Sequence, residues 1–150
     1  MTQPPTTNCH HTLQLRVRYC ECDPMGVAHH ASYVPWMEMG RTELLRATGV
    51  SYAQLEKDGV FLVIVRLNVS YKRPIRYDDV VEVRTKWTGG GKVKIEHEYE
   101  LWVVEQGGHA MGAIAGSQSE HAFLAATGQT TLGCVDKAGK IQALPSWLAG

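Results

Sequence analysis

The hydrophobic pattern of this chain changes its period once, near residue 60, and that change constrains the fold more than any other feature. Before it, apolar side chains follow helical spacing and stop at Gly49, which predicts one long helix with Ser32 as N-cap. After it, apolar and polar residues alternate in successive runs, as in strands with one buried face. The predicted apolar face of the helix consists of Tyr33, Met37, Gly40, Leu44 and Leu45.

Five strands are expected, one before the long helix and four after it. They cover residues 13–19, 61–72, 80–87, 93–103 and 121–135. In the first strand Tyr19 should face inward, and in the fourth His97 should be a core histidine with satisfied polar groups. A short second helix is expected over residues 51–58, and Gly89–Gly91 should form a hairpin turn. This element order predicts an α+β fold with one antiparallel sheet packed on one helix.

One helix cannot cover both faces of five strands, so part of the sheet needs another covering. Residues 61–65 are all apolar, which predicts burial on both faces of that strand. We therefore expect a second subunit to cover an edge or a face, giving a homodimer or homotetramer. Residues 1–11 should be a flexible tail, residues 12–150 a single domain, and residues 105–120, rich in Gly, Ala and Ser, an inserted loop.

Charge and composition exclude several classes of protein. Lys and Arg number 15, as do Asp and Glu, so the net charge gives no bulk attraction to nucleic acid or to an anionic membrane. No apolar run approaches the roughly 20 residues of a membrane-spanning helix. The polar N-terminal segment does not resemble a signal peptide, so a cytoplasmic location and reduced cysteines are expected.

The densest set of reactive side chains lies between the first strand and the long helix. Asp23-Pro24-Met25-Gly26 suits a type I turn, and that role alone would explain Asp23. However, His30 follows seven residues later at the start of a helix, where unpaired N–H groups favour developing negative charge. A carboxylate beside such groups predicts an active-site loop.

The pattern Asp23-x-x-Gly26-Val27-x-x-His30-x-x-Tyr33 closely resembles the signature of the 4-hydroxybenzoyl-CoA thioesterase-like acyl-CoA thioesterases. The resemblance covers roughly residues 12 to 145 and includes Tyr71-x-x-Pro74 and Asp136-x-x-Gly139-Lys140. It implies the hotdog fold, a five-stranded antiparallel sheet wrapped around one long central helix. It also implies hydrolysis of a CoA thioester to a carboxylic acid and free CoA. No cofactor is expected, because a thioester is already an activated acyl group.

The same resemblance implies roles for individual residues. Asp23 acts as general base or as nucleophile, and these two versions remain open. Backbone N–H groups near His30 and Ala31 polarise the carbonyl, and His30 assists. The other residues expected to line the oxyanion site or to position substrate are Gly26, Val27, His29, Ala31 and Tyr19.

Five basic residues are candidates for binding the phosphates of CoA: Lys72, Arg73, Arg76, Lys92 and Lys94. Gly89-Gly90-Gly91-Lys92 is not a phosphate-binding loop of the P-loop kind, because it joins two strands and no Ser or Thr follows the lysine. An acyl carrier protein as the carrier of the acyl group also stays open.

Three alternatives compete with the thioesterase hypothesis. A hotdog hydratase or dehydratase would use a histidine with a carboxylate on the same fold. A non-catalytic acyl-binding module would keep the fold without the chemistry. A metal site of His29 and His30, joined by Cys20, Cys22 or Asp23, is disfavoured, because Cys-x-Cys lacks the usual spacing of zinc ligands. The acyl group itself, whether aromatic, short and branched or of medium length, is not specified by the motif.

Overall fold

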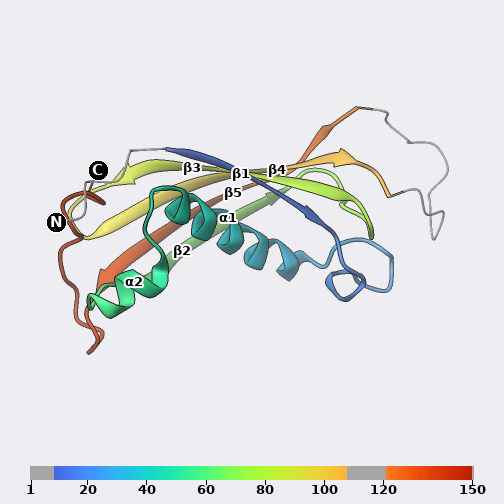
Figure 1. Ribbon diagram of the computed structural model, residues 1–150. Coiled ribbons are helices and arrows are strands. Elements are labelled where there is room, and N and C mark those ends of the chain that lie inside the picture. The colour runs from blue at the N-terminus through green and yellow to red at the C-terminus, as the bar shows by residue number, and fades with distance from the viewer. Residues whose placement is uncertain (1–8, 108–120, 150) are drawn as a thin grey trace.

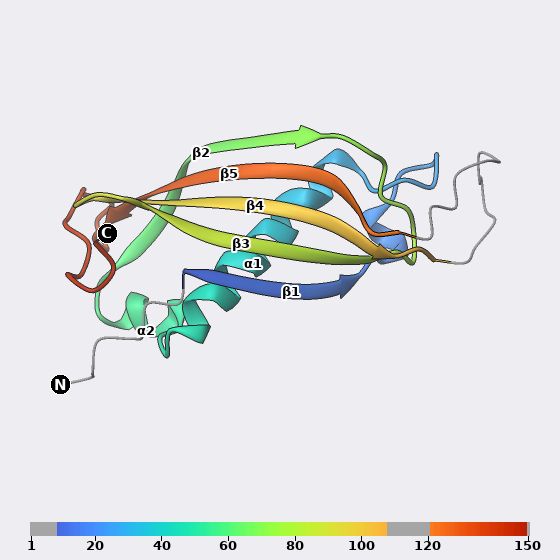
Figure 2. The ribbon, with the colours of Figure 1, turned by 90° about the horizontal axis from the view of Figure 1, so that it is seen from above.

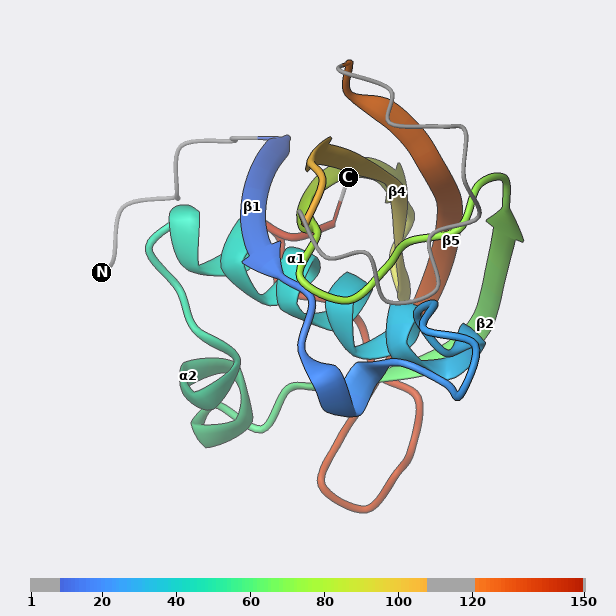
Figure 3. The same ribbon diagram turned by 90° about the vertical axis from the view of Figure 1, so that its right-hand side faces the viewer.

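The computed structural model describes residues 9–107 and 121–149. Five antiparallel strands form one sheet in the order β1-β3-β4-β5-β2. The sheet curves around one long helix, α1, which lies on its concave face (Figures 1 and 3). The strands are β1 (His10–Arg16), β2 (Phe61–Tyr71), β3 (Val80–Gly90), β4 (Lys94–Glu105) and β5 (Phe123–Val135), and the helices are α1 (Tyr33–Ala47) and α2 (Tyr52–Lys57). The predicted α+β architecture is confirmed.

Helix α1 is buried along the face that its sequence pattern predicts. Trp36 and Met37 are almost completely inaccessible and pack on the inner side chains of β3, β4 and β5. Gly40 allows the helix to approach the sheet, because a Cβ atom there would collide with Thr85 Oγ1 and lie 3.0 Å from Val83 Cγ1. Close packing therefore explains a residue that otherwise weakens a helix. Gly49, with φ 93°, ends the helix as expected.

The first strand differs from the expected one at both ends. It begins at His10, and it stops at Arg16. Tyr19 then lies in a short 3₁₀ turn, η1 (Tyr19–Glu21), so its inward orientation was a wrong prediction. The strand alternation ends before Tyr19, and its side chain is 79% exposed, in edge-to-face contact with Tyr77.

Strand β2 lies at an edge of the sheet, next to β5 alone (Figure 2). The prediction that residues 61–65 are buried on both faces of the strand was therefore wrong for a single chain. Val63, Ile64 and Val65 are 42%, 45% and 56% exposed.

Of the expected loop 105–120, residues 108–120 lie outside the described part of the chain. No helix in the described residues is long and apolar enough to span a membrane.

His97 is buried in the sheet's inner face, but it is not the satisfied core histidine that was expected. Its Nδ1 atom has no hydrogen-bond partner within the described residues. Burial, and then the positive charge of Arg41, lower the pKa of His97 from 6.5 to about 4. The neutral imidazole is thus the form that the folded core accepts.

Acid should therefore destabilise the fold through His97. The pKa of His97 is lower in the folded state than in the unfolded state. The contribution of neutral His97 to the free energy of unfolding is therefore fully present above about pH 6.5 and is lost as the pH falls toward 4. Between pH 6.5 and 4.5 the loss should be roughly 2–3 kcal/mol. Urea unfolding of wild type and His97→Gln at pH 7 and 4.5 measures it, and the variant should show a smaller pH dependence. Identical pH dependence in both proteins would contradict this assignment.

Candidate active site

The Asp23 loop is a closed turn at one end of the sheet, as its sequence predicts. The Gly26 N–H donates to the Asp23 carbonyl at 2.9 Å, and the Met25 N–H donates to Asp23 Oδ1 at 2.9 Å. Gly26 has φ 79°, which glycine adopts without strain. The Asp23 N–H donates in turn to the Val27 carbonyl at 2.8 Å. The turn holds one carboxylate oxygen of a half-buried side chain.

The start of the helix is built differently from the expected Ser32 cap. A 3₁₀ turn, η2 (His30–Ser32), precedes α1, and His29 Nδ1 accepts from the Ala31 N–H at 3.0 Å. The hydroxyl of Ser32 instead donates to the Glu21 carbonyl at 2.8 Å. The Ala31 N–H is therefore already bonded, which corrects its expected role as a free donor.

The N–H groups of Val27 and His30 make no hydrogen bond to another described residue, and both belong to the segment that joins Asp23 to α1. The His30 carbonyl is held by the hydroxyl of Tyr71 at 2.8 Å, so strand β2 fixes the first turn from the other side. Tyr71 also meets Tyr33 edge to face at 4.8 Å. The imidazoles of His29 and His30 are exposed and lie against each other, with centroids 4.1 Å apart.

The five basic residues fall into two separate groups. Lys72 and Arg73 follow β2, and Arg76 forms a bridge with Val27, so these three lie at the end of the sheet that carries the Asp23 loop. The Arg73 guanidinium is stacked 3.8 Å above the ring of Phe123. Lys92 and Lys94 lie at the β3–β4 turn, where β4 begins. The length of β4, roughly 35 Å, separates this turn from the end of the sheet that carries the Asp23 loop. One chain therefore cannot bring all five to one phosphate group.

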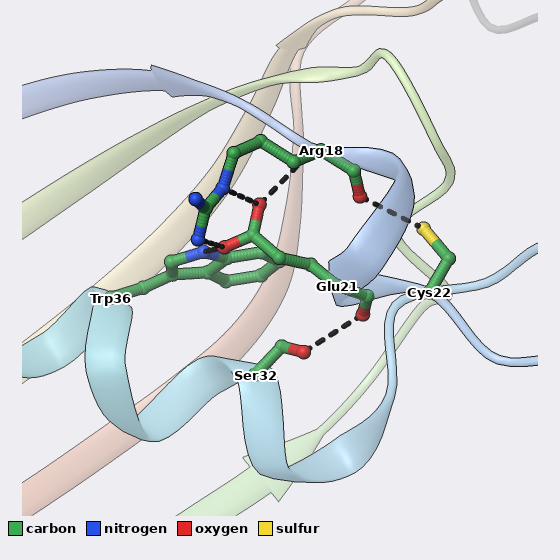
Figure 4. A network of polar contacts seen from close by, with 5 residues as sticks. All are labelled: Arg18, Glu21, Cys22, Ser32 and Trp36. Carbon is green, nitrogen blue, oxygen red and sulfur yellow. Dashed lines mark hydrogen bonds and ion pairs between the residues drawn. The ribbon is translucent and has the colours of Figure 1, made fainter.

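Sequence reasoning missed a partly buried polar network behind the loop, shown in Figure 4. The carboxylate of Glu21 accepts from the Trp36 indole N–H at 2.7 Å and from the Arg18 N–H at 2.8 Å. The Arg18 guanidinium lies 3.3 Å from the same carboxylate. Burial raises the pKa of Glu21, but the hydrogen bonds from the Arg18 N–H, Trp36 and the guanidinium outweigh it, so the pKa lies below its usual value. The carboxylate is thus an ionised acceptor.

Little in the sequence could have identified this network. The spacing of Arg18 and Glu21 suits a local ion pair, but nothing in the chain links either of them to Trp36, 15 residues further on. No set of three His, Cys, Asp or Glu side chains in the described ranges is arranged to hold a metal ion. The arrangement instead supplies a carboxylate, two backbone donors and a supporting network. Such a set can activate water or attack a carbonyl whose oxygen is polarised.

The sequence is similar to proteins that act on thioesters. The family model described as thioesterase-like superfamily matches residues 17–150. The putative acyl-CoA thioesterase YneP of Bacillus subtilis is 44% identical over 72 residues, which are 48% of this chain and 52% of that protein. The acyl-CoA thioester hydrolase YbgC of Escherichia coli is 40% identical over 74 residues, 49% of this chain and 55% of the relative. The aligned segments thus span about half the length of both relatives.

Among solved structures, the DHNA-CoA thioesterase from Staphylococcus aureus has a TM-score of 0.75 and 30% sequence identity. The superposition covers 90% of this chain and 80% of that one. The similarity therefore extends over nearly the whole fold.

Proposed function

The chain belongs to the thioesterase-like superfamily, and from this membership and the site geometry we propose that it is an acyl-CoA thioesterase. It hydrolyses a CoA thioester to a carboxylic acid and free CoA. The observation that carries the proposal is the Asp23 carboxylate, held in a turn directly before a helix start that offers the unbonded His30 N–H. The names of YneP, YbgC and the Staphylococcus aureus enzyme, each a thioesterase or thioester hydrolase, support it.

In the general-base version, Asp23 takes a proton from water while the water oxygen attacks the thioester carbon. The carbonyl oxygen becomes an oxyanion and is stabilised by the N–H groups of His30 and Val27 and by the positive end of the helix dipole. The intermediate then collapses, the C–S bond breaks, and the CoA thiolate receives the proton that Asp23 holds.

In the nucleophile version, an Asp23 oxygen attacks the same carbon and expels CoA as a thiolate. The resulting mixed anhydride is hydrolysed by water, which restores the carboxylate. Both versions need the same oxyanion donors, and His30 and His29 line the approach to them in either case. Tyr19 was expected to face inward, but its side chain is exposed. Its proposed role is therefore to contact substrate at the rim of the site.

Release of free thiol tests the proposal directly. Purified protein is incubated with a panel of aromatic, short branched and medium-chain CoA thioesters and with acyl carrier protein thioesters, and thiol is followed with a chromogenic disulfide. We expect turnover of at least one CoA thioester. Binding without thiol release would favour the acyl-binding module, and addition of water to an enoyl-CoA would favour the hydratase.

The separation of the basic residues predicts which of them bind CoA phosphates. Neutralising Lys72, Arg73 and Arg76 to Gln should raise KM for a CoA thioester about tenfold or more with a smaller change in kcat. Contacts made equally in the ground state and the transition state have this effect. The matched control is Lys92→Gln with Lys94→Gln at the far turn, which should leave KM within about twofold when one chain supplies the phosphate site. A KM that responds only to the far pair would place the phosphates on a neighbouring subunit.

A second copy of the chain is part of the proposal. Among the described strands β2 pairs only with β5, and it carries the exposed apolar side chains of Val63, Ile64, Val65 and Leu67. Soluble proteins rarely leave such an edge open. We therefore infer a homodimer or homotetramer that pairs or covers β2. Because Tyr71 at the end of β2 holds the helix start, the active site then lies close to the subunit boundary.

A further inference from the structure

We propose that Glu21 is a positioning residue for catalysis, one that holds Asp23 and the helix start at a fixed separation. This inference rests on the proposed thioesterase activity. Glu21 lies two residues before Asp23 and does not enter the reaction itself. It is buried behind the loop, where its side chain and its main chain bind different elements (Figure 4).

The side chain of Glu21 ties the loop to the first turn of α1. It accepts the Trp36 indole N–H at 2.7 Å, and Trp36 is itself only 1% exposed at the centre of the core. On the other side it binds the N–H and the guanidinium of Arg18, where β1 leaves the sheet. The carboxylate thus joins the segment before the loop to the helix after it. Charge-assisted bonds of this kind are strong and directional.

The carbonyl of Glu21 fixes the helix start. It accepts the His29 N–H at 2.8 Å and the Ser32 hydroxyl at 2.8 Å. His29 and Ser32 flank His30, whose N–H is the proposed oxyanion donor. Asp23 and His30 are therefore connected through one buried residue, and a shift of Glu21 moves the base relative to the donor. Misplacement by about 1 Å can cost roughly 100-fold in rate.

Glu21→Gln tests the inference while keeping the size of the side chain. The amide has one oxygen for three donors and brings an N–H₂ group toward Arg18, so the network must rearrange. We expect kcat on the best thioester to fall about 10- to 100-fold with KM within about threefold. Trp36→Phe removes the indole donor from the other side and should lower kcat in the same way. Because both variants break one connection, the double variant should lose little more than the worse single one.

Glu82→Gln is the matched control. Glu82 is also a largely buried carboxylate, 17% exposed in its side chain against 11% for Glu21, and it is paired with Arg84 at 2.7 Å. It lies on β3, and its carboxylate bonds Arg84 and Gln14, neither of which belongs to the Asp23 loop. Glu82→Gln should lower the urea midpoint about as much as Glu21→Gln does. It should leave kcat per folded molecule within about twofold of wild type.

The outcomes separate the inference from the proposed function. If wild type releases thiol and Glu21→Gln keeps kcat within twofold, Glu21 only stabilises the fold and the inference is wrong, while the thioesterase proposal stands. Additive losses in the double variant would also overturn it. If wild type hydrolyses no thioester in the panel, the proposed function fails and the inference fails with it.

Discussion

Asp23→Asn should lower kcat by at least about 100-fold on the best thioester, with binding retained. The reason is that the asparagine side chain neither attacks the carbonyl carbon nor accepts a proton from water, and general-base catalysis typically supplies about 10²- to 10⁴-fold. The turn should survive, because the Asn Oδ1 can still accept the Met25 N–H. Steady-state kinetics, with urea unfolding of the same preparations, measures both effects.

The chain contains a closely matched control for this variant. In Asp136-Lys137-Ala138-Gly139 the Ala138 N–H donates to Asp136 Oδ1 at 2.9 Å and the Gly139 N–H donates to the Asp136 carbonyl at 2.9 Å. The Asp23 turn has the same two bonds, and the two turn glycines have φ 79° and 80°. Asp136→Asn should therefore change stability as Asp23→Asn does and leave kcat unchanged. A kcat for Asp23→Asn within tenfold of wild type would refute the catalytic role.

Val65→Lys should convert the proposed oligomer to smaller species and reduce thioesterase activity at least tenfold. Val65 is the most exposed of the apolar side chains on the β2 edge, so lysine there should disturb the single chain little. A charge on an edge strand opposes pairing with another strand. Light scattering at micromolar concentration, with activity measured on the same samples, should show a lower molar mass together with the loss of rate.

Ile141→Lys serves as the control for this experiment. Ile141 is 73% exposed and lies outside the five strands, after the Asp136 turn. The same change of side chain there should leave both molar mass and activity as in wild type. A wild type that is monomeric and fully active at micromolar concentration would refute the assembly and the placement of the site at a subunit boundary.

The sequence by itself determined the elements and the Asp23 turn, because these depend on neighbours along the chain. Helical spacing ending at Gly49, and alternation after residue 60, each report which side of one element is buried. The Asp23 turn follows from the preferences of Asp, Pro and Gly at three of its four positions. Except for the first strand, which was placed three residues too late, these features were predicted with nearly the observed bounds, since a local pattern contains all the information that they need.

Only the tertiary structure decided which groups meet. Tyr19 points outward because β1 ends at Arg16, and the Ala31 N–H is occupied because His29 turns back on the helix start. Lys92 and Lys94 lie far from Arg76 because a full strand separates them. Glu21 meets Trp36 only because the segment after β1 folds back against the first turn of α1. Contacts between residues distant in sequence depend on the packing of whole elements, and no periodicity within one element encodes them.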